Sequence, residues 1–169
     1  MLGTRLLLAI VFVPMIVEAR IAAMNERTLL RRGAIEPEGD VYAVMRVAYP
    51  AVFLAMILEG AFFPGHERVV TGLAVFMAAK LLKSWAMTSL GDAWTFRVLT
   101  LPDMRLVRSG PYRWLRHPNY IGVAGELVGV ALMSGARVAG PVGTVLFLAL
   151  VMRRISVEER ALRSSDRQI

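Results

Sequence analysis

Five apolar segments separated by short polar stretches dominate the chain, and this pattern predicts membrane-spanning helices. The segments are residues 2–17, 44–63, 69–90, 120–134 and 138–152. A helix needs about 17–25 largely apolar residues to cross a bilayer, so the last two segments reach that length only by borrowing flanking residues. Because only Gly135, Ala136 and Arg137 separate these two segments, we expect them to form a tight helical hairpin.

The first apolar segment leads into further helix-forming sequence. It is followed by Glu18, Ala19 and Arg20, which do not make the small-residue cleavage site of a secretory signal peptide. We therefore interpret it as a retained span that continues as helix to about Met24, and a cleaved signal is the less favoured alternative. Gly33 is the expected stop of this helical stretch.

Composition supports a membrane protein and excludes several chemistries. Of the 169 residues, 56% are hydrophobic and 20% are charged, whereas soluble domains have about 45–50% and 25%; the mean hydropathy is +0.54. The absence of cysteine excludes disulfides and thiolate nucleophiles. The only histidines are His66 and His117, too few for a His-rich site, and we expect no metal.

The distribution of positive charge predicts the orientation of the chain. With the N-terminus outside, the outer segments carry Arg5, Arg68 and Arg137, and the other 17 of the 20 lysines and arginines lie at inner positions. This bias predicts five spans with the N-terminus outside and the C-terminus in the cytoplasm. The net charge of +7 is accordingly expected to contact anionic lipids rather than nucleic acid.

The inner loop of residues 91–117 is the first candidate for function, because it is too polar to span and too long for a simple turn. Pro118 suits the first position of the fourth span, which places His117 near its N-cap at the membrane surface. The free N–H groups of such a helix start favour an anionic ligand group. Taken singly, Tyr112 and Tyr120 also fit simple anchoring at the lipid headgroups.

Charged residues on the last two spans are the second candidate. Arg154 and Glu158 are four residues apart and share one helix face. They lie at the same membrane side as the inner loop. A solvated, charged helix end is the alternative explanation of their spacing. Glu126 lies in the middle of the fourth span, where a carboxylate must face a partner or a cavity. A structural pair with Lys80 or Lys83 is slightly favoured over a substrate contact.

Motifs at the inner face extend over nearly the whole chain. They are Leu106 and Val107, Gly110, Tyr112, residues 116–120, Arg154, Glu158 and Glu159, and, upstream, residues 18–20, 25–26, 33–36 and 89–95. These stretches resemble the isoprenylcysteine carboxyl methyltransferase family, integral-membrane enzymes that use S-adenosylmethionine. The upstream stretches are similar to a short bacterial branch, in which some members methylate long-chain alkylpyrones or alkylresorcinols made by type III polyketide synthases.

The resemblance implies roles for individual residues around a cytoplasmic cofactor pocket. Arg154 would be catalytic and face the reacting oxygen of the substrate. The family pattern has a histidine where this chain has Met104 and Arg105. The implied cofactor-binding residues are Leu106, Val107, Tyr112, His117, Pro118, Asn119, Tyr120 and Glu158, and the candidate substrate contacts are Trp94, Arg97 and Glu126.

Together these features predict one all-α membrane domain over residues 1–169, with residues 164–169 disordered. The expected activity is S-adenosylmethionine-dependent methylation of a carboxylate or an acidic enol or phenol oxygen. The acceptor would be lipophilic, either prenylcysteine-like or an alkylpyrone or alkylresorcinol. Two alternatives stay open, namely an NADPH-dependent enzyme similar to membrane sterol reductases and a non-enzymatic membrane assembly or transport subunit. The sequence does not specify the oligomeric state.

Overall fold

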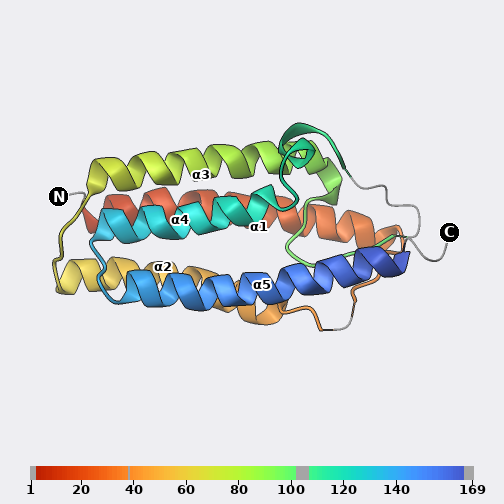
Figure 1. The fold of residues 1–169 in the computed structure, drawn as a ribbon. Coiled ribbons are helices and arrows are strands. Elements are labelled where there is room, and N and C mark those ends of the chain that lie inside the picture. The colour runs from red at the N-terminus through yellow and green to blue at the C-terminus, as the bar shows by residue number, and fades with distance from the viewer. Residues whose placement is uncertain (1–2, 38, 102–106, 166–169) are drawn as a thin grey trace.

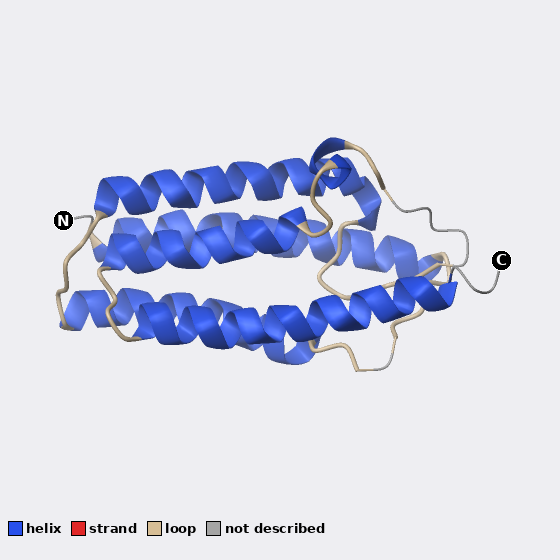
Figure 2. Cartoon of the chain, viewed as in Figure 1, coloured by secondary structure: helices blue, strands red, loops and turns tan. Residues whose placement is uncertain are grey.

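Five helices run along one common axis and form an elongated bundle (Figure 1). A computed structural model describes residues 3–37, 39–101 and 107–165, with side chains as far as residue 160. Over this part of the chain there is no strand (Figure 2), and the all-α prediction is confirmed. The helices are α1 (Thr4–Arg31), α2 (Tyr42–Phe62), α3 (Val69–Leu90), α4 (Pro118–Ser134) and α5 (Ala139–Ser165), with the short 3-10 helices η1 (Gly91–Ala93) and η2 (Gly110–Arg113).

The apolar segments correspond to the helices, so the fold is that of an all-α integral membrane protein. Within the described residues, α1, α2, α3 and α5 are long and apolar enough to cross a membrane. The fourth predicted span corresponds to α4, which has 17 residues and is short, as expected. The tight hairpin is also confirmed, because α4 ends at Gly135 with a φ of 67° and α5 begins at Ala139.

Two helix ends lie beyond the apolar segments. Helix α1 continues to Arg31, and Gly33, with a φ of 86°, follows its end as predicted. Helix α5 continues to Ser165, and residues 166–169 of the tail for which disorder is predicted lie outside the described residues. Both extensions are rich in Arg and Glu, which are good helix formers and need no apolar surroundings.

Glycines allow α3 and α4 to pack backbone against backbone. Gly122, Gly125 and Gly129 lie along one face of α4 that contacts α3. A Cβ atom on Gly129 would lie 2.8 Å from the backbone nitrogen of Phe76, and one on Gly72 would lie 2.7 Å from the Gly129 carbonyl oxygen. Small residues that permit such close approach are a main source of helix association in membranes.

A buried network of charges joins α1, α3 and α4 and reaches α2. The Lys80 and Lys83 ammonium groups each lie 2.7 Å from a carboxylate oxygen of Glu18, and 3.0 and 3.3 Å from Glu126 Oε1. The hydroxyl of Tyr49 donates a hydrogen bond to the other oxygen of Glu126. The network pairs two carboxylates with two ammonium groups, which confirms the predicted pairing of Glu126 with the lysines.

One end of the bundle collects the long connections of the chain. The segment between α1 and α2, the segment between α3 and α4, and the last turns of α5 all lie there (Figure 1). The opposite end has only the short connections from α2 to α3 and from α4 to α5. Because polar loops gather at one end, any water-accessible chemistry is expected at that end.

Candidate functional site

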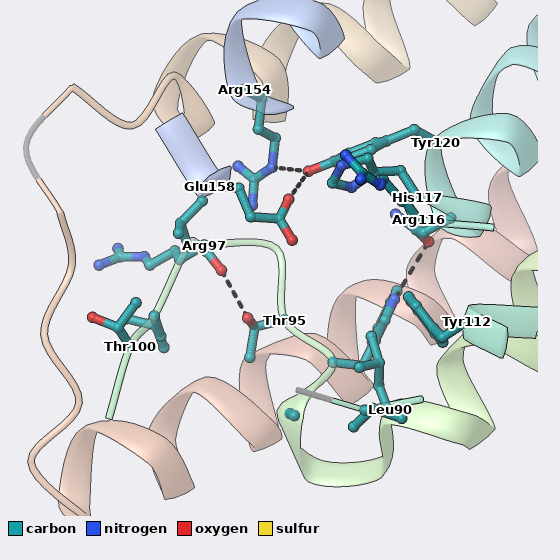
Figure 3. Close-up of a pocket in the computed structure, with 16 residues that line it drawn as sticks. Leu90, Thr95, Arg97, Thr100, Tyr112, Arg116, His117, Tyr120, Arg154 and Glu158 are labelled. Carbon is teal, nitrogen blue, oxygen red and sulfur yellow. Dashed lines mark hydrogen bonds between the residues drawn. The ribbon is translucent and has the colours of Figure 1, made fainter. Parts of the chain in front are cut away.

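A cavity of about 210 Å³ opens at the end of the bundle that carries the long loops (Figure 3). Its wall combines the end of α3, the extended segment that follows it, the start of α4 and the C-terminal part of α5. It is lined by Leu90, Ala93, Trp94, Thr95, Arg97, Val98, Leu99, Thr100, Val107, Tyr112, Arg116, His117, Asn119, Tyr120, Arg154 and Glu158.

Side chains of α1 hold the extended part of this wall, residues 94–97, in place. The Asn25 amide donates a hydrogen bond of 2.8 Å to the carbonyl oxygen of Trp94. Glu26 Oε1 accepts hydrogen bonds from the backbone N–H groups of Phe96 and Arg97, at 3.2 and 3.3 Å. This segment has no helix or sheet to satisfy its backbone groups, so α1 supplies the partners.

A hydrogen-bonded chain of side chains crosses the pocket from α5 to α4 and back (Figure 3). Arg154 Nε donates to the hydroxyl oxygen of Tyr120 at 2.9 Å, and this hydroxyl donates to Glu158 Oε2 at 3.0 Å. Arg154 is 6% exposed. The arrangement places one cation and one anion on opposite sides of a phenol, so the pocket presents both signs of charge within one cluster.

The positive charge of Arg154 is balanced by a residue that sequence reasoning did not identify. Arg154 Nη1 lies 3.0 Å from Asp40 Oδ1, and the side chain of Asp40 is 2% exposed. Asp40 lies two residues before the first residue of α2, and Oδ1 also accepts a hydrogen bond from the backbone N–H of Tyr42. An Asp before a helix is a common capping signal, which marks a structural position but does not indicate contact with a distant arginine.

The start of α4 borders the pocket as the sequence predicts. Pro118 is the first helical residue and His117 is the N-cap. The imidazole Nε2 of His117 lies 3.5 Å from Glu159 Oε1, and its ring lies 5.7 Å from that of Tyr120. The helix start therefore combines an aromatic wall with a partial positive charge from its N–H groups.

Two further aromatic residues complete the wall. Trp94 is 3% exposed, and its indole N–H donates to Asn119 Oδ1 at 3.4 Å. Burial, together with the nearby carboxylate of Glu158, raises the pKa of the Tyr112 phenol above its usual value. Tyr112 therefore stays protonated at neutral pH and keeps its capacity to donate a hydrogen bond.

The structure brings most of the predicted site residues together. Pro118 is buried at the start of α4 and does not line the cavity, and Glu126 lies in the buried charge network instead. Leu106, Met104 and Arg105 fall outside the described residues. The predicted residues that do line the cavity are Trp94, Arg97, Val107, Tyr112, His117, Asn119, Tyr120, Arg154 and Glu158.

Arg97 lies at the rim of the pocket and is already engaged by other side chains. Its Nη1 lies 3.0 Å from Glu36 Oε2, its Nε lies 3.8 Å from Glu26 Oε2, and its guanidinium stacks 5.5 Å from the ring centre of Tyr42. The proposed contact of Arg97 with a substrate therefore competes with these three partners. The other lining residues are Leu90, Ala93, Thr95 and Arg116, which belong to motif stretches but have no predicted role, and Val98, Leu99 and Thr100, which the sequence does not mark.

Comparison with known proteins shows the family of the chain. A sequence model of the isoprenylcysteine carboxyl methyltransferase family matches residues 70–164, more than half of the chain. The chain belongs to this family. Its members are membrane-bound methyltransferases that use S-adenosylmethionine. The matched region contains the pocket residues from Leu90 to Glu158, whereas Asn25, Glu26 and Asp40 precede it.

Individual relatives agree with the family assignment. The protein YpbQ of Bacillus subtilis is 31% identical over 160 residues, which covers 94% of this chain and 95% of that protein. The protein-S-isoprenylcysteine O-methyltransferase of Tribolium castaneum is 27% identical over 70% of this chain and 44% of its own length. The protein-S-isoprenylcysteine O-methyltransferase B of Arabidopsis thaliana is 29% identical over 65% of this chain and 59% of its own length.

Proposed function

We propose that this protein is an S-adenosylmethionine-dependent O-methyltransferase that modifies an anionic oxygen of a lipophilic acceptor. The observation that carries the proposal is the half-buried Arg154–Tyr120–Glu158 chain in the pocket of a membrane methyltransferase family member. The acceptor would carry a carboxylate, as in a prenylated cysteine, or an acidic enol or phenol, as in a long-chain alkylpyrone or alkylresorcinol.

The residues around the pocket fit S-adenosylmethionine, which has an ammonium, a carboxylate, an adenine and a sulfonium. Glu158 suits the ammonium, and the α4 start at His117 suits the carboxylate. The rings of Tyr112 and Tyr120 suit the adenine and the sulfonium, the latter by cation–π attraction. When bound, this cofactor supplies a methyl group as an electrophile on sulfur.

The protein's own groups would act by positioning rather than by covalent or strong general-base chemistry. Arg154 would hold the acceptor oxygen as an anion by charge-assisted hydrogen bonds, and its bond to Tyr120 would keep the guanidinium in the pocket. The neutral phenol of Tyr112 adds no competing negative charge. Alignment of the two reactants in a site shielded from water accounts for the expected rate enhancement.

The proposed orientation places the pocket in the cytoplasm, with the N-terminus outside the bacterial inner membrane. It rests on the concentration of lysines and arginines at the pocket end. The chain has no cysteine, so single cysteines introduced at the exposed residues Ser109 and His66 would report the two ends. An impermeant maleimide added to intact spheroplasts should label His66→Cys only, and labelling of Ser109→Cys only would reverse the orientation.

The activity is tested with membranes that contain the full-length protein and labelled S-adenosylmethionine. Candidate acceptors are a farnesylated cysteine derivative, an alkylpyrone and an alkylresorcinol, with mass spectrometry to identify any methylated lipid. Binding of S-adenosylhomocysteine and of NADPH to the purified protein is measured in parallel by calorimetry. Transfer to one acceptor class with binding of S-adenosylhomocysteine supports the proposal, whereas binding of NADPH alone would favour a reductase.

Two pocket variants test the site itself. Arg154→Ala removes the cation that would hold the acceptor oxygen, so we expect transfer to fall at least a hundredfold, about the effect of removing a transition-state contact. Glu158→Ala should weaken S-adenosylhomocysteine binding and transfer together. Arg153→Ala is the matched control, because Arg153 is exposed on the same helical turn. Full activity in both pocket variants would contradict the site assignment.

A further inference from the structure

We infer that Asp40 is a positioning residue whose carboxylate fixes the Arg154 guanidinium and ties it to the pocket wall. Asp40 lies between α1 and α2, before the region matched by the family model. The inference rests on the proposed function, because it assigns to Asp40 a role that acts through Arg154. The buried side chain of Asp40 accepts three hydrogen bonds, and these carry the inference.

Both oxygens of the Asp40 carboxylate are occupied by donors from separate parts of the chain. Oδ1 accepts from Arg154 Nη1 of α5 and from the backbone N–H of Tyr42 at the start of α2, each at 3.0 Å. Oδ2 accepts from the backbone N–H of Val98 in the pocket wall, also at 3.0 Å. With the side chain 2% exposed, this is a buried anion fully engaged by protein groups.

These contacts leave one nitrogen of the Arg154 guanidinium, Nη2, for a ligand. Nε donates to Tyr120 and Nη1 donates to Asp40. Two hydrogen bonds to a planar, rigid group fix both its position and its plane. Within the described residues Nη2 of Arg154 makes no hydrogen bond, and Arg154 lines the cavity. Nη2 is therefore the nitrogen that the geometry presents to an acceptor oxygen.

Asp40 also links the arginine to the extended segment of the pocket wall. Val98 is 7% exposed, as is its neighbour Leu99, and both line the cavity. Since one carboxylate binds the Val98 backbone and Arg154 together, a shift of the wall moves the guanidinium with it. This coupling distinguishes a positioning role from simple capping of α2, which needs only the contact with Tyr42.

A double-mutant cycle separates the two roles, because residues that act as a unit give non-additive effects. The variants are Asp40→Asn, Arg154→Lys and the combination, made in the full-length protein with the acceptor identified as above. In Asp40→Asn an amide nitrogen, which cannot accept a hydrogen bond, replaces one carboxylate oxygen. Either the N–H of Val98 or the two donors Arg154 and Tyr42 then lose their acceptor. Asp92→Asn is the control, since Asp92 is exposed on η1.

Asp40→Asn should lower kcat about ten- to a hundredfold, the range for a misplaced catalytic contact. Calorimetry without cofactor should show the acceptor bound about tenfold more weakly, while the Kd of S-adenosylhomocysteine stays within twofold of wild type. In the Arg154→Lys background, Asp40→Asn should change kcat by less than threefold. If Asp40→Asn does not accumulate, Asp40→Glu should give the same pattern, because it keeps the charge but displaces the carboxylate.

Wild-type kcat and acceptor affinity in Asp40→Asn would overturn the inference. Effects of Asp40→Asn and Arg154→Lys that multiply in the combined variant would do the same, because they would show that Asp40 acts independently of Arg154. Failure of the proposed function would already be visible in the wild-type protein, before any variant is compared. Wild-type protein would then neither bind S-adenosylhomocysteine nor transfer a methyl group, and the inference would fall with it.

Discussion

Replacing Glu126 by Gln should destabilise the fold strongly, although the two side chains have almost the same shape. The amide oxygen of Gln can still accept the hydrogen bond from Tyr49, so the change removes mainly one negative charge. In wild type that charge faces Lys80 Nζ at 3.0 Å and Lys83 Nζ at 3.3 Å. The variant leaves two ammonium groups opposite the single carboxylate of Glu18.

The size of the effect follows from burial. Side-chain exposure is 1% for Glu126 and 3% for Lys83, so water cannot compensate the unpaired charge. Removing one partner of a buried ion pair typically costs about 3–5 kcal/mol. Because Lys83 keeps its contact with Glu18 at 2.7 Å, we expect the lower end, about 3 kcal/mol, which is about a hundredfold in the unfolding equilibrium.

The free energy of unfolding can be measured by SDS titration in mixed micelles, with fluorescence of the three tryptophans as the signal. The matched variant combines Glu126→Gln with Lys83→Met, which leaves the Glu18–Lys80 pair at 2.7 Å and restores charge balance. It should recover most of the lost stability. A cost below about 1 kcal/mol for Glu126→Gln alone would refute this reasoning, as would a combined variant that is no more stable than the single one.

Two further predictions concern the packing of the bundle. Glu59→Ala removes the carboxylate that accepts three hydrogen bonds of 2.6–2.9 Å from the backbone N–H groups of residues 137–139 at the start of α5. The loss of this cap should cost about 1 kcal/mol of stability and lower the thermal midpoint of unfolding in detergent. An unchanged midpoint would contradict this prediction. Gly129→Leu should cost about 1–3 kcal/mol by overpacking, because its Cβ would lie 2.8 Å from Phe76. Val128→Leu, at an exposed position, is its control, and equal midpoints for the two variants would show that α3 and α4 do not need this close contact.

The helical spans were predictable because each carries a continuous apolar signal. The predicted limits of the third span, 69–90, coincide with α3, where Arg68 precedes the apolar run and Gly91 follows it. The ends of α1 and α5 were not predictable from hydropathy, because their last turns lie beyond the apolar run and are charged. The hairpin was predictable, because only Gly135, Ala136 and Arg137 separate the two apolar runs, and glycine commonly follows the end of a helix.

The site was predictable only where it carries a motif. Tyr112, His117, Tyr120, Arg154 and Glu158 belong to recognisable stretches, and the structure brings all of them to one cavity. The wall at residues 98–100 carries no local signal, because its conformation is set by distant side chains. Asp40 was missed for the same reason, since its contact with Arg154 spans 114 positions in the sequence and leaves no periodicity or spacing to read.

The long-range contacts indicate how the two parts of the chain depend on one another. The region matched by the family model supplies two buried cations, Lys83 and Arg154. Each is paired with a carboxylate that precedes that region, Glu18 for Lys83 and Asp40 for Arg154. A buried cation without its partner costs several kcal/mol, an amount comparable with much of the stability of a whole domain. The first two helices and the loop between them are therefore an integral part of the fold, and Asp40 makes that loop part of the pocket, because it pairs with Arg154 in the cavity wall.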